Sequence, residues 1–188
     1  MSITQTMSVS MQCVSAVLAG SFLLTSGQAV AADNEPDAHF TCSGSGSQSY
    51  NPGLILLARP VNMTNEASFP SCTGNTVASA TSATPLFTDH LNADCLTLSP
   101  GGHHYVNYVW DDGTKSLFVG TTKVSRQPTQ ITVSSSGTFT AGRFAGHPVE
   151  AVITYPAPAF PPYLLSCLAE PGLTSLSGPT SVTVLPIL

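Results

Sequence analysis

The stretch Tyr105–Phe118 reads YVNYVWDDGTKSLF, and its pattern predicts a β-hairpin. Side chains alternate along a strand, so one face should carry Val106, Tyr108 and Trp110 and the other Tyr105, Asn107 and Val109. Asp112-Gly113 is a strong signal for a tight turn. We therefore expect Trp110, the only tryptophan, to point into the core at the end of the strand. Asp111 and Asp112 are then turn residues.

The rest of the chain has the same character. Short segments rich in Val, Ile, Thr, Tyr and Phe alternate with turn residues, and 15 glycines and 15 prolines leave little room for long helices. The expected strands are His39–Cys42, Tyr50–Leu57, Asp94–Leu98, Tyr105–Trp110, Lys115–Val124, Gln130–Ser135, Val149–Tyr155, Tyr163–Leu168 and Ser181–Leu185. Half-buried strands of this kind favour antiparallel sheets. The expected fold is an all-β antiparallel β-sandwich, immunoglobulin-like or a related Greek key, with a small closed β-barrel as the alternative.

Three stretches interrupt the strand pattern. Ser43–Ser47 (SGSGS) is expected to be a flexible loop beside Cys42, and Thr73–Leu91 is the most loop-like internal stretch. The glycines of Gly137–Gly146 are too frequent for a regular ladder. There we expect a bend, a bulge or a strand that changes sheets.

The N-terminal segment has the features of a secretory signal peptide. Val14–Leu24 is an apolar run too short to span a bilayer as a helix, and Ala29-Val30-Ala31 supplies an A-x-A cleavage pattern. This predicts a signal over residues 1–31 and one domain over 32–188, with 32–38 disordered. The expected product is a secreted protein without a stable membrane span. The alternatives are a retained N-terminal anchor and a buried helix, since no Lys or Arg precedes the apolar run.

Removal of the signal leaves four cysteines: Cys42, Cys72, Cys95 and Cys167. An even number in an exported chain predicts two disulfides, and three pairings are possible. We favour Cys42 with Cys72 and Cys95 with Cys167. No two cysteines have the short spacing of a zinc knuckle, so we expect no metal site and no cofactor.

The composition excludes one class of partner. Only 8% of residues are charged, the net charge is −5, and five Lys and Arg residues are scattered along the chain. Without a basic patch, nucleic acid is not an expected partner. A surface rich in hydroxyl groups suits an extracellular protein that lies against polymers or cell walls. It suits a protease-resistant secreted domain equally well.

The residue types used in catalysis do not form a known constellation. Asp111 and Asp112 are adjacent, so a strand would point them to opposite faces, and the same holds for His103 and His104. No Gly-x-Ser-x-Gly elbow is present. We therefore expect no catalytic residue and no enzyme. A hydrolase that uses Asp111, Asp112 and a histidine is the least favoured interpretation.

Several motifs together resemble one group of proteins. In order along the chain these are the signal, Cys42, Tyr50–Leu54 (YNPGL), Cys72, Cys95, Trp110–Ser116 (WDDGTKS), Gly137–Gly146, Cys167 and Gly172–Gly178 (GLTSLSG). This order is similar to that of small secreted Ser/Thr-rich four-cysteine β-proteins of actinobacteria. That group has no assigned activity, so the resemblance implies no functional residue.

The expected function is therefore non-enzymatic binding outside the cell, or association with a surface, with an extracellular protein or polysaccharide as partner. The candidate binding residues are aromatic: Trp110, Tyr105, Tyr108, Tyr155, Phe160 and Tyr163. The alternative is a secreted protease inhibitor that presents the Pro-rich segment 155–165, because a stiff extended loop tied by a disulfide is typical of such inhibitors.

Overall fold

The computed structural model describes residues 37–75, 83–98, 102–156 and 165–188, with the backbone alone over 83–89. All of them belong to one compact unit, Ala32–Leu188. The expected signal peptide at 1–31 lies outside the described residues, as do Phe160 and Tyr163.

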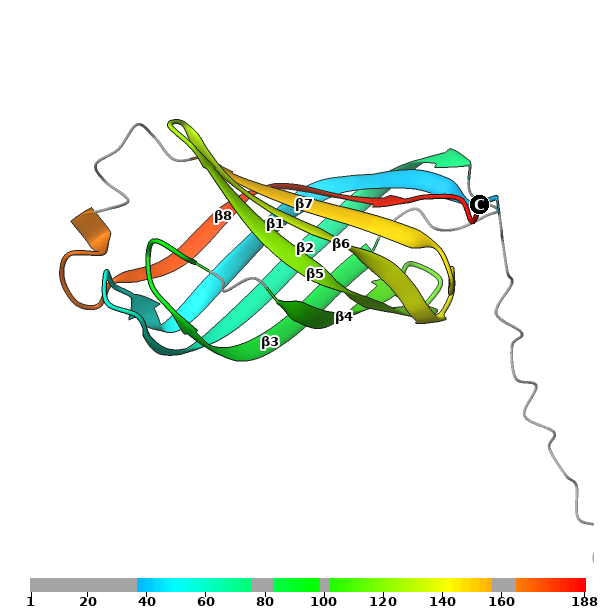
Figure 1. Cartoon of the computed structure of the whole chain (residues 1–188). Helices are drawn as coiled ribbons and strands as arrows, with labels where there is room; N and C mark the ends of the chain where they lie inside the picture. Colours follow the sequence, from blue (N-terminus) through cyan, green and yellow to red (C-terminus); the bar gives the residue numbers. More distant parts are fainter. Residues whose placement is uncertain (1–36, 76–82, 99–101, 157–164) are drawn as a thin grey trace, which may run out of the picture. The chain divides into compact units, whose positions relative to one another are not determined.

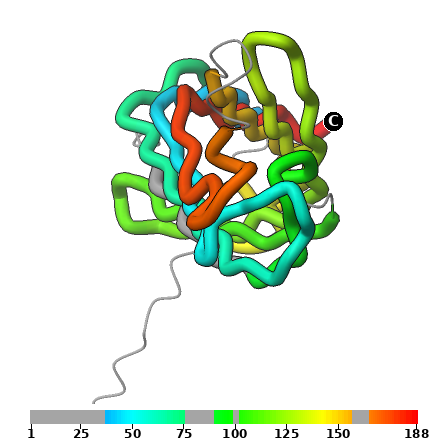
Figure 2. Tube along the Cα trace, turned by 90° about the vertical axis from the view of Figure 1, so that its left-hand side faces the viewer, coloured from blue at the N-terminus to red at the C-terminus, as the bar shows by residue number. Residues whose placement is uncertain are grey.

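Eight antiparallel strands build this unit. They are β1 (His39–Leu54), β2 (Arg59–Asn75), β3 (Ala83–Ala93), β4 (His103–Trp110), β5 (Lys115–Gln127), β6 (Gln130–Gly142), β7 (Pro148–Pro156) and β8 (Leu173–Val184). Each strand pairs with its neighbours in sequence, and β8 pairs with β1, which closes the sheet into a barrel (Figure 1). Figure 2 brings the β1–β2 turn (cyan) and the segment before β8 (orange) to the front.

The all-β antiparallel class with two disulfides is thus confirmed, and the sandwich is not. A Greek-key sandwich needs two facing sheets, whereas these strands form one sheet in the order of the sequence. The seam between the first and last strands runs from Phe40 opposite Val184 to Ser49 opposite Ser175. This long ladder agrees with the alternative, a small closed β-barrel.

The alternation along the strands directs one set of side chains into the barrel. In β4 the side chains of Val106, Tyr108 and Trp110 are buried, while Tyr105 is 65% exposed. The predicted hairpin is also confirmed, because Gly113 N donates to Trp110 O and β4 pairs with β5. The Trp110 indole meets the Phe144 ring edge-on, with 5.1 Å between the ring centroids.

The buried side chains form two clusters rather than one. An aromatic cluster includes Phe40, Phe69, Tyr108, Trp110, Phe118, Phe139 and Phe144. A second, mostly aliphatic cluster includes Leu54, Val61, Met63, Leu98, Ile131, Val133, Ile153 and Leu173, together with Tyr50 and Tyr155.

Three segment predictions were wrong. Ser43–Ser47 belongs to β1, and its glycines allow close contacts: a Cβ on Gly44 would lie 1.8 Å from the Ser68 carbonyl oxygen. Asp94–Leu98 is a turn, because Asp94 Oδ1 accepts hydrogen bonds from the amides of Leu96 and Thr97. Residues 165–168 are not a strand either: Leu165 and Ser166 are helical, and the Leu168 N–H donates to the Leu165 carbonyl oxygen.

Two further stretches had different outcomes. The expected irregularity within Gly137–Gly146 is confirmed as a bulge: Phe118 pairs with Phe139 and Leu117 with Ala141, which leaves Thr140 without an opposite residue. The expected loop Thr73–Leu91 is wrong at both ends, where residues 73–75 belong to β2 and 83–91 to β3. Its centre, residues 76–82, lies outside the described part.

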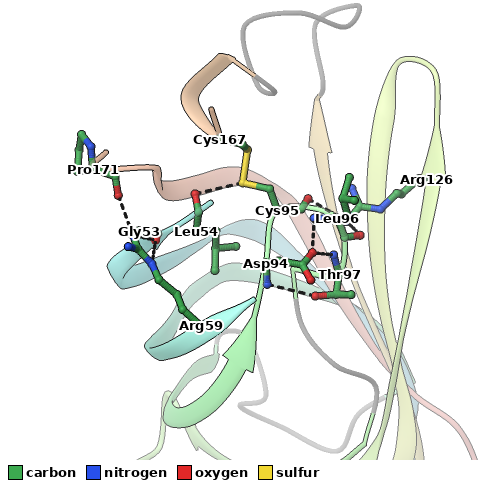
Figure 3. The surroundings of a disulfide bond; sticks show 10 residues. All are labelled: Gly53, Leu54, Arg59, Asp94, Cys95, Leu96, Thr97, Arg126, Cys167 and Pro171. Carbon is green, nitrogen blue, oxygen red and sulfur yellow. Dashed lines mark hydrogen bonds between the residues drawn. A yellow bond between two sulfur atoms is a disulfide. The ribbon is translucent and has the colours of Figure 1, made fainter. Parts of the chain in front are cut away.

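The favoured cysteine pairing is confirmed for both disulfides. Cys42 and Cys72 are directly opposite in the β1–β2 ladder. Cys95, just after β3, is joined to Cys167, ahead of β8, at one end of the barrel (Figure 3). There the Arg126 side chain donates to the backbone oxygens of Cys95 and Leu96. The described residues contain no helix that is long and apolar enough to cross a membrane.

Candidate ligand-binding site

A cavity of about 110 Å³ lies inside the barrel, lined by members of both clusters. Its apolar wall includes Met63, Phe69, Val106, Phe118, Val133 and Ile153. The strand alternation that buries these side chains also directs them at this space. The barrel interior is therefore not filled completely by its own side chains.

Polar groups interrupt the apolar wall on three neighbouring strands. His104 of β4, Thr122 of β5 and Ser135 of β6 all line the cavity. The His104 Nδ1 atom lies 3.0 Å from Thr122 Oγ1, which lies 3.1 Å from Ser135 Oγ. Because a hydroxyl group both donates and accepts, this row of hydrogen-bonded side chains can interact with either a donor or an acceptor on a bound molecule.

Gln48 is the most buried polar side chain of the lining, at 2% exposure. The Tyr50 hydroxyl donates to Gln48 Oε1 over 3.1 Å, which fixes one end of the amide. Within the described part of the chain, no other hydrogen bond to this side chain is present, so the Nε2 donor is left for the cavity. Asn65 is directly opposite Gln48 in the β1–β2 ladder and lines the cavity beside it.

The cavity meets the surface where two strands diverge. Among the described residues, β3 pairs with β4 only over Ala83–Leu86, opposite Asn107–Trp110. The following part of β3 pairs with β2 alone, and the start of β4 with β5. Gly102 and His103, both exposed, lie at this gap and line the cavity. The described lining therefore reaches the surface at this side of the barrel.

The site is electrically quiet. Among the described lining residues there is no Asp, Glu, Lys or Arg. Tyr108 also lines the cavity, and burial raises the pKa of its hydroxyl well above the usual range. The phenol stays neutral at physiological pH. His103 and His104 are the only described lining side chains that can carry a positive charge, so the arrangement suits an uncharged molecule better than a charged one.

The candidate aromatic residues do not gather at one site. Tyr108 lines the cavity, whereas Trp110 and Tyr155 are buried outside its lining and Tyr105 faces solvent on β4. The Tyr155 hydroxyl is buried without a hydrogen-bond partner in the described structure.

The adjacent acids lie in the hairpin turn, as expected, but Asp112 has a further role. Its Oδ2 atom lies 2.7 Å from the Arg143 guanidinium, whose side chain is only 9% exposed. Asp112 Oδ1 accepts from the Thr114 backbone amide, which holds the turn. The described residues contain no group of His, Cys, Asp or Glu that could hold a metal ion.

Comparison of this chain with protein-family models, curated proteins and solved structures gave no match. The resemblance to secreted actinobacterial β-proteins stays a prediction. Sequence reasoning also did not identify Gln48, Asn65, Thr122 and Ser135 as site residues. Their signal was present: each is a polar residue at an inward position of an alternating strand. The signal can be recognised only once the strand register is known, and the glycines before Gln48 made that part of β1 look like a loop.

Proposed function

We propose that this chain is a secreted, non-enzymatic binding protein that holds a small, uncharged, mostly apolar molecule inside its barrel. The observation that carries the proposal is the cavity between the two core clusters. Eight-stranded barrels are just wide enough either to be filled by side chains or to enclose one small ligand. Here apolar walls supply the binding energy and a few polar groups supply orientation, as is usual for ligand sites.

The placement of the titratable residues favours binding over catalysis. A general acid or base must lie within hydrogen-bond reach of the reacting group. The acids of the β4–β5 turn lie outside the lining, and Asp112 is held by Arg143. His104 lines the cavity, and its Nδ1 contacts the Thr122 hydroxyl group.

Two disulfides support the extracellular part of the proposal, because disulfides persist in oxidising compartments. The protease-inhibitor alternative stays a prediction, since residues 157–164 of the proposed loop lie outside the described part. The buried Tyr155 side chain does not favour it, because a presented loop needs accessible side chains.

The proposal is tested by titrating the ¹⁵N-labelled protein with methylenecyclopentane, a small uncharged hydrocarbon, and following amide resonances by NMR. We expect saturable shifts at cavity residues such as Val106, Val133 and Ile153. The variant Ala151→Leu places a larger side chain in the cavity wall and should abolish the shifts. Ala141→Leu, a matched change at an exposed position of β6, should not. The absence of saturable binding, or equal binding by both variants, would refute the proposal.

A further inference from the structure

We infer, building on the proposed function, that Gln48 and Asn65 recognise a carbonyl oxygen of the bound molecule. The ligand class is then a small neutral carbonyl compound, such as a ketone, an ester or an amide. The first ground is the state of Gln48. A side-chain amide that is buried at 2% exposure normally has all its hydrogen-bonding groups satisfied.

The contacts of Gln48 determine which group is left for the ligand. Because the Tyr50 hydroxyl donates to Oε1, the free end of the amide is its NH₂ group, a donor. Among the described residues the Tyr155 hydroxyl is the only buried polar side-chain atom without a partner, so Gln48 Nε2 remains accessible from the cavity. A ligand that covers Nε2 without accepting its hydrogen bond would incur a cost of about 1–3 kcal/mol. The cavity therefore favours molecules that place an acceptor at this point.

Asn65 strengthens the same preference from the neighbouring strand. Residues opposite each other in an antiparallel ladder direct their side chains to the same face, and Gln48 and Asn65 are such a pair. A carbonyl oxygen has two lone pairs and can accept from both amides, whereas a hydrocarbon can accept from neither.

The lining also selects among acceptors by charge. No Lys or Arg is among the described lining residues, so a carboxylate would have only the imidazoles of His103 and His104 as possible partners and would otherwise be buried unpaired. A neutral carbonyl avoids this cost. The volume limits the size of the enclosed part of a ligand. An apolar cavity of about 150 Å³ holds benzene, so one of about 110 Å³ encloses roughly four non-hydrogen atoms. A larger ligand would extend toward His103 at the surface.

The test compares two molecules of the same shape. Cyclopentanone carries a carbonyl group where methylenecyclopentane carries a C=CH₂ group, and both are titrated by NMR into the unmodified protein and Gln48→Leu. We expect Gln48→Leu to bind the ketone roughly ten-fold more weakly, which corresponds to the loss of one hydrogen bond. Binding of the hydrocarbon should be unchanged or stronger, which also shows that the variant keeps its cavity.

Two further variants guard the interpretation. Gln48→Met keeps the length of the side chain but removes its donor, so it should also lose ketone binding. Gln127→Leu changes an exposed glutamine at the end of β5 and should bind both molecules normally. Equal loss of both molecules in Gln48→Leu, or unchanged ketone binding, would overturn the inference while the proposed function stands. If the unmodified protein binds neither molecule, both fall.

Discussion

Replacement of Ser116 by alanine should destabilise the barrel through two buried hydrogen bonds. Ser116 is 1% exposed, and its Oγ accepts from Trp110 Nε1 over 2.8 Å while it donates to the Arg143 carbonyl oxygen. Alanine leaves both the indole N–H and the carbonyl without this partner. Each buried unsatisfied group costs about 1–3 kcal/mol. With two such groups, the expected loss in the free energy of unfolding is about 2–6 kcal/mol.

Urea unfolding followed by far-UV circular dichroism, with both disulfides intact, measures this loss. Trp110→Phe removes the indole donor, so Ser116→Ala in that background should cost only about half as much. Ser125→Ala, at an exposed position of the same strand, should change stability by less than about 0.5 kcal/mol. A loss below about 0.5 kcal/mol for Ser116→Ala, or the same loss with and without Trp110, would refute the reasoning.

Three other perturbations test separate parts of the structure. Burial raises the pKa of Tyr108 and Tyr155. As the pH rises, both hydroxyl groups therefore ionise in the unfolded chain before they ionise in the folded one. The free energy of unfolding should fall by about 2.7 kcal/mol per pH unit above a pH of about 10. Tyr108→Phe should halve that slope in urea unfolding curves recorded across this range, and an unchanged slope would contradict the assignment. The Cys95–Cys167 disulfide joins residues 72 apart and the Cys42–Cys72 disulfide residues 30 apart. Replacing each pair by alanine should therefore lower the free energy of unfolding by about 4.4 and about 3.7 kcal/mol, respectively. The reverse order would count against chain entropy as the cause. Asp112→Asn should lower the free energy of unfolding by about 2 kcal/mol, a value between those for surface and buried ion pairs. Because the Arg143 side chain is mostly buried, most of this loss should persist in about 1 M NaCl. A loss that vanishes in salt would instead place the ion pair at the surface.

The elements that the sequence predicted well are those that local pattern determines. The β4–β5 hairpin follows from the alternation around Tyr108 and the Asp112-Gly113 turn, and these features do not depend on the rest of the fold. The cysteine pairing also agreed with expectation. The burial of Trp110 was predicted because Trp110 lies on the same face of the strand as Val106.

What the sequence did not reveal depends on partners that are distant along the chain. Whether the last strand pairs with β1 or with a second sheet is decided by the β1–β8 ladder, which no local pattern encodes. The Ser43–Ser47 stretch was mistaken for a loop because its glycines are needed for close strand contacts, a tertiary constraint that overrides β-propensity. Gln48, which follows directly, was lost as a site residue for the same reason.

The closing seam of the barrel also has a consequence for assembly. The Cys42–Cys72 disulfide lies within the first hairpin, so it can form as soon as β1 and β2 meet. The β1–β8 seam must instead join residues as far apart as Phe40 and Val184, and the entropy cost of closing a loop grows with its length. Until β8 is in place, β1 and β7 are open sheet edges with unpaired backbone groups, which are templates for pairing with another chain. The last strand therefore protects the folded protein against aggregation as well as completing the wall of the cavity.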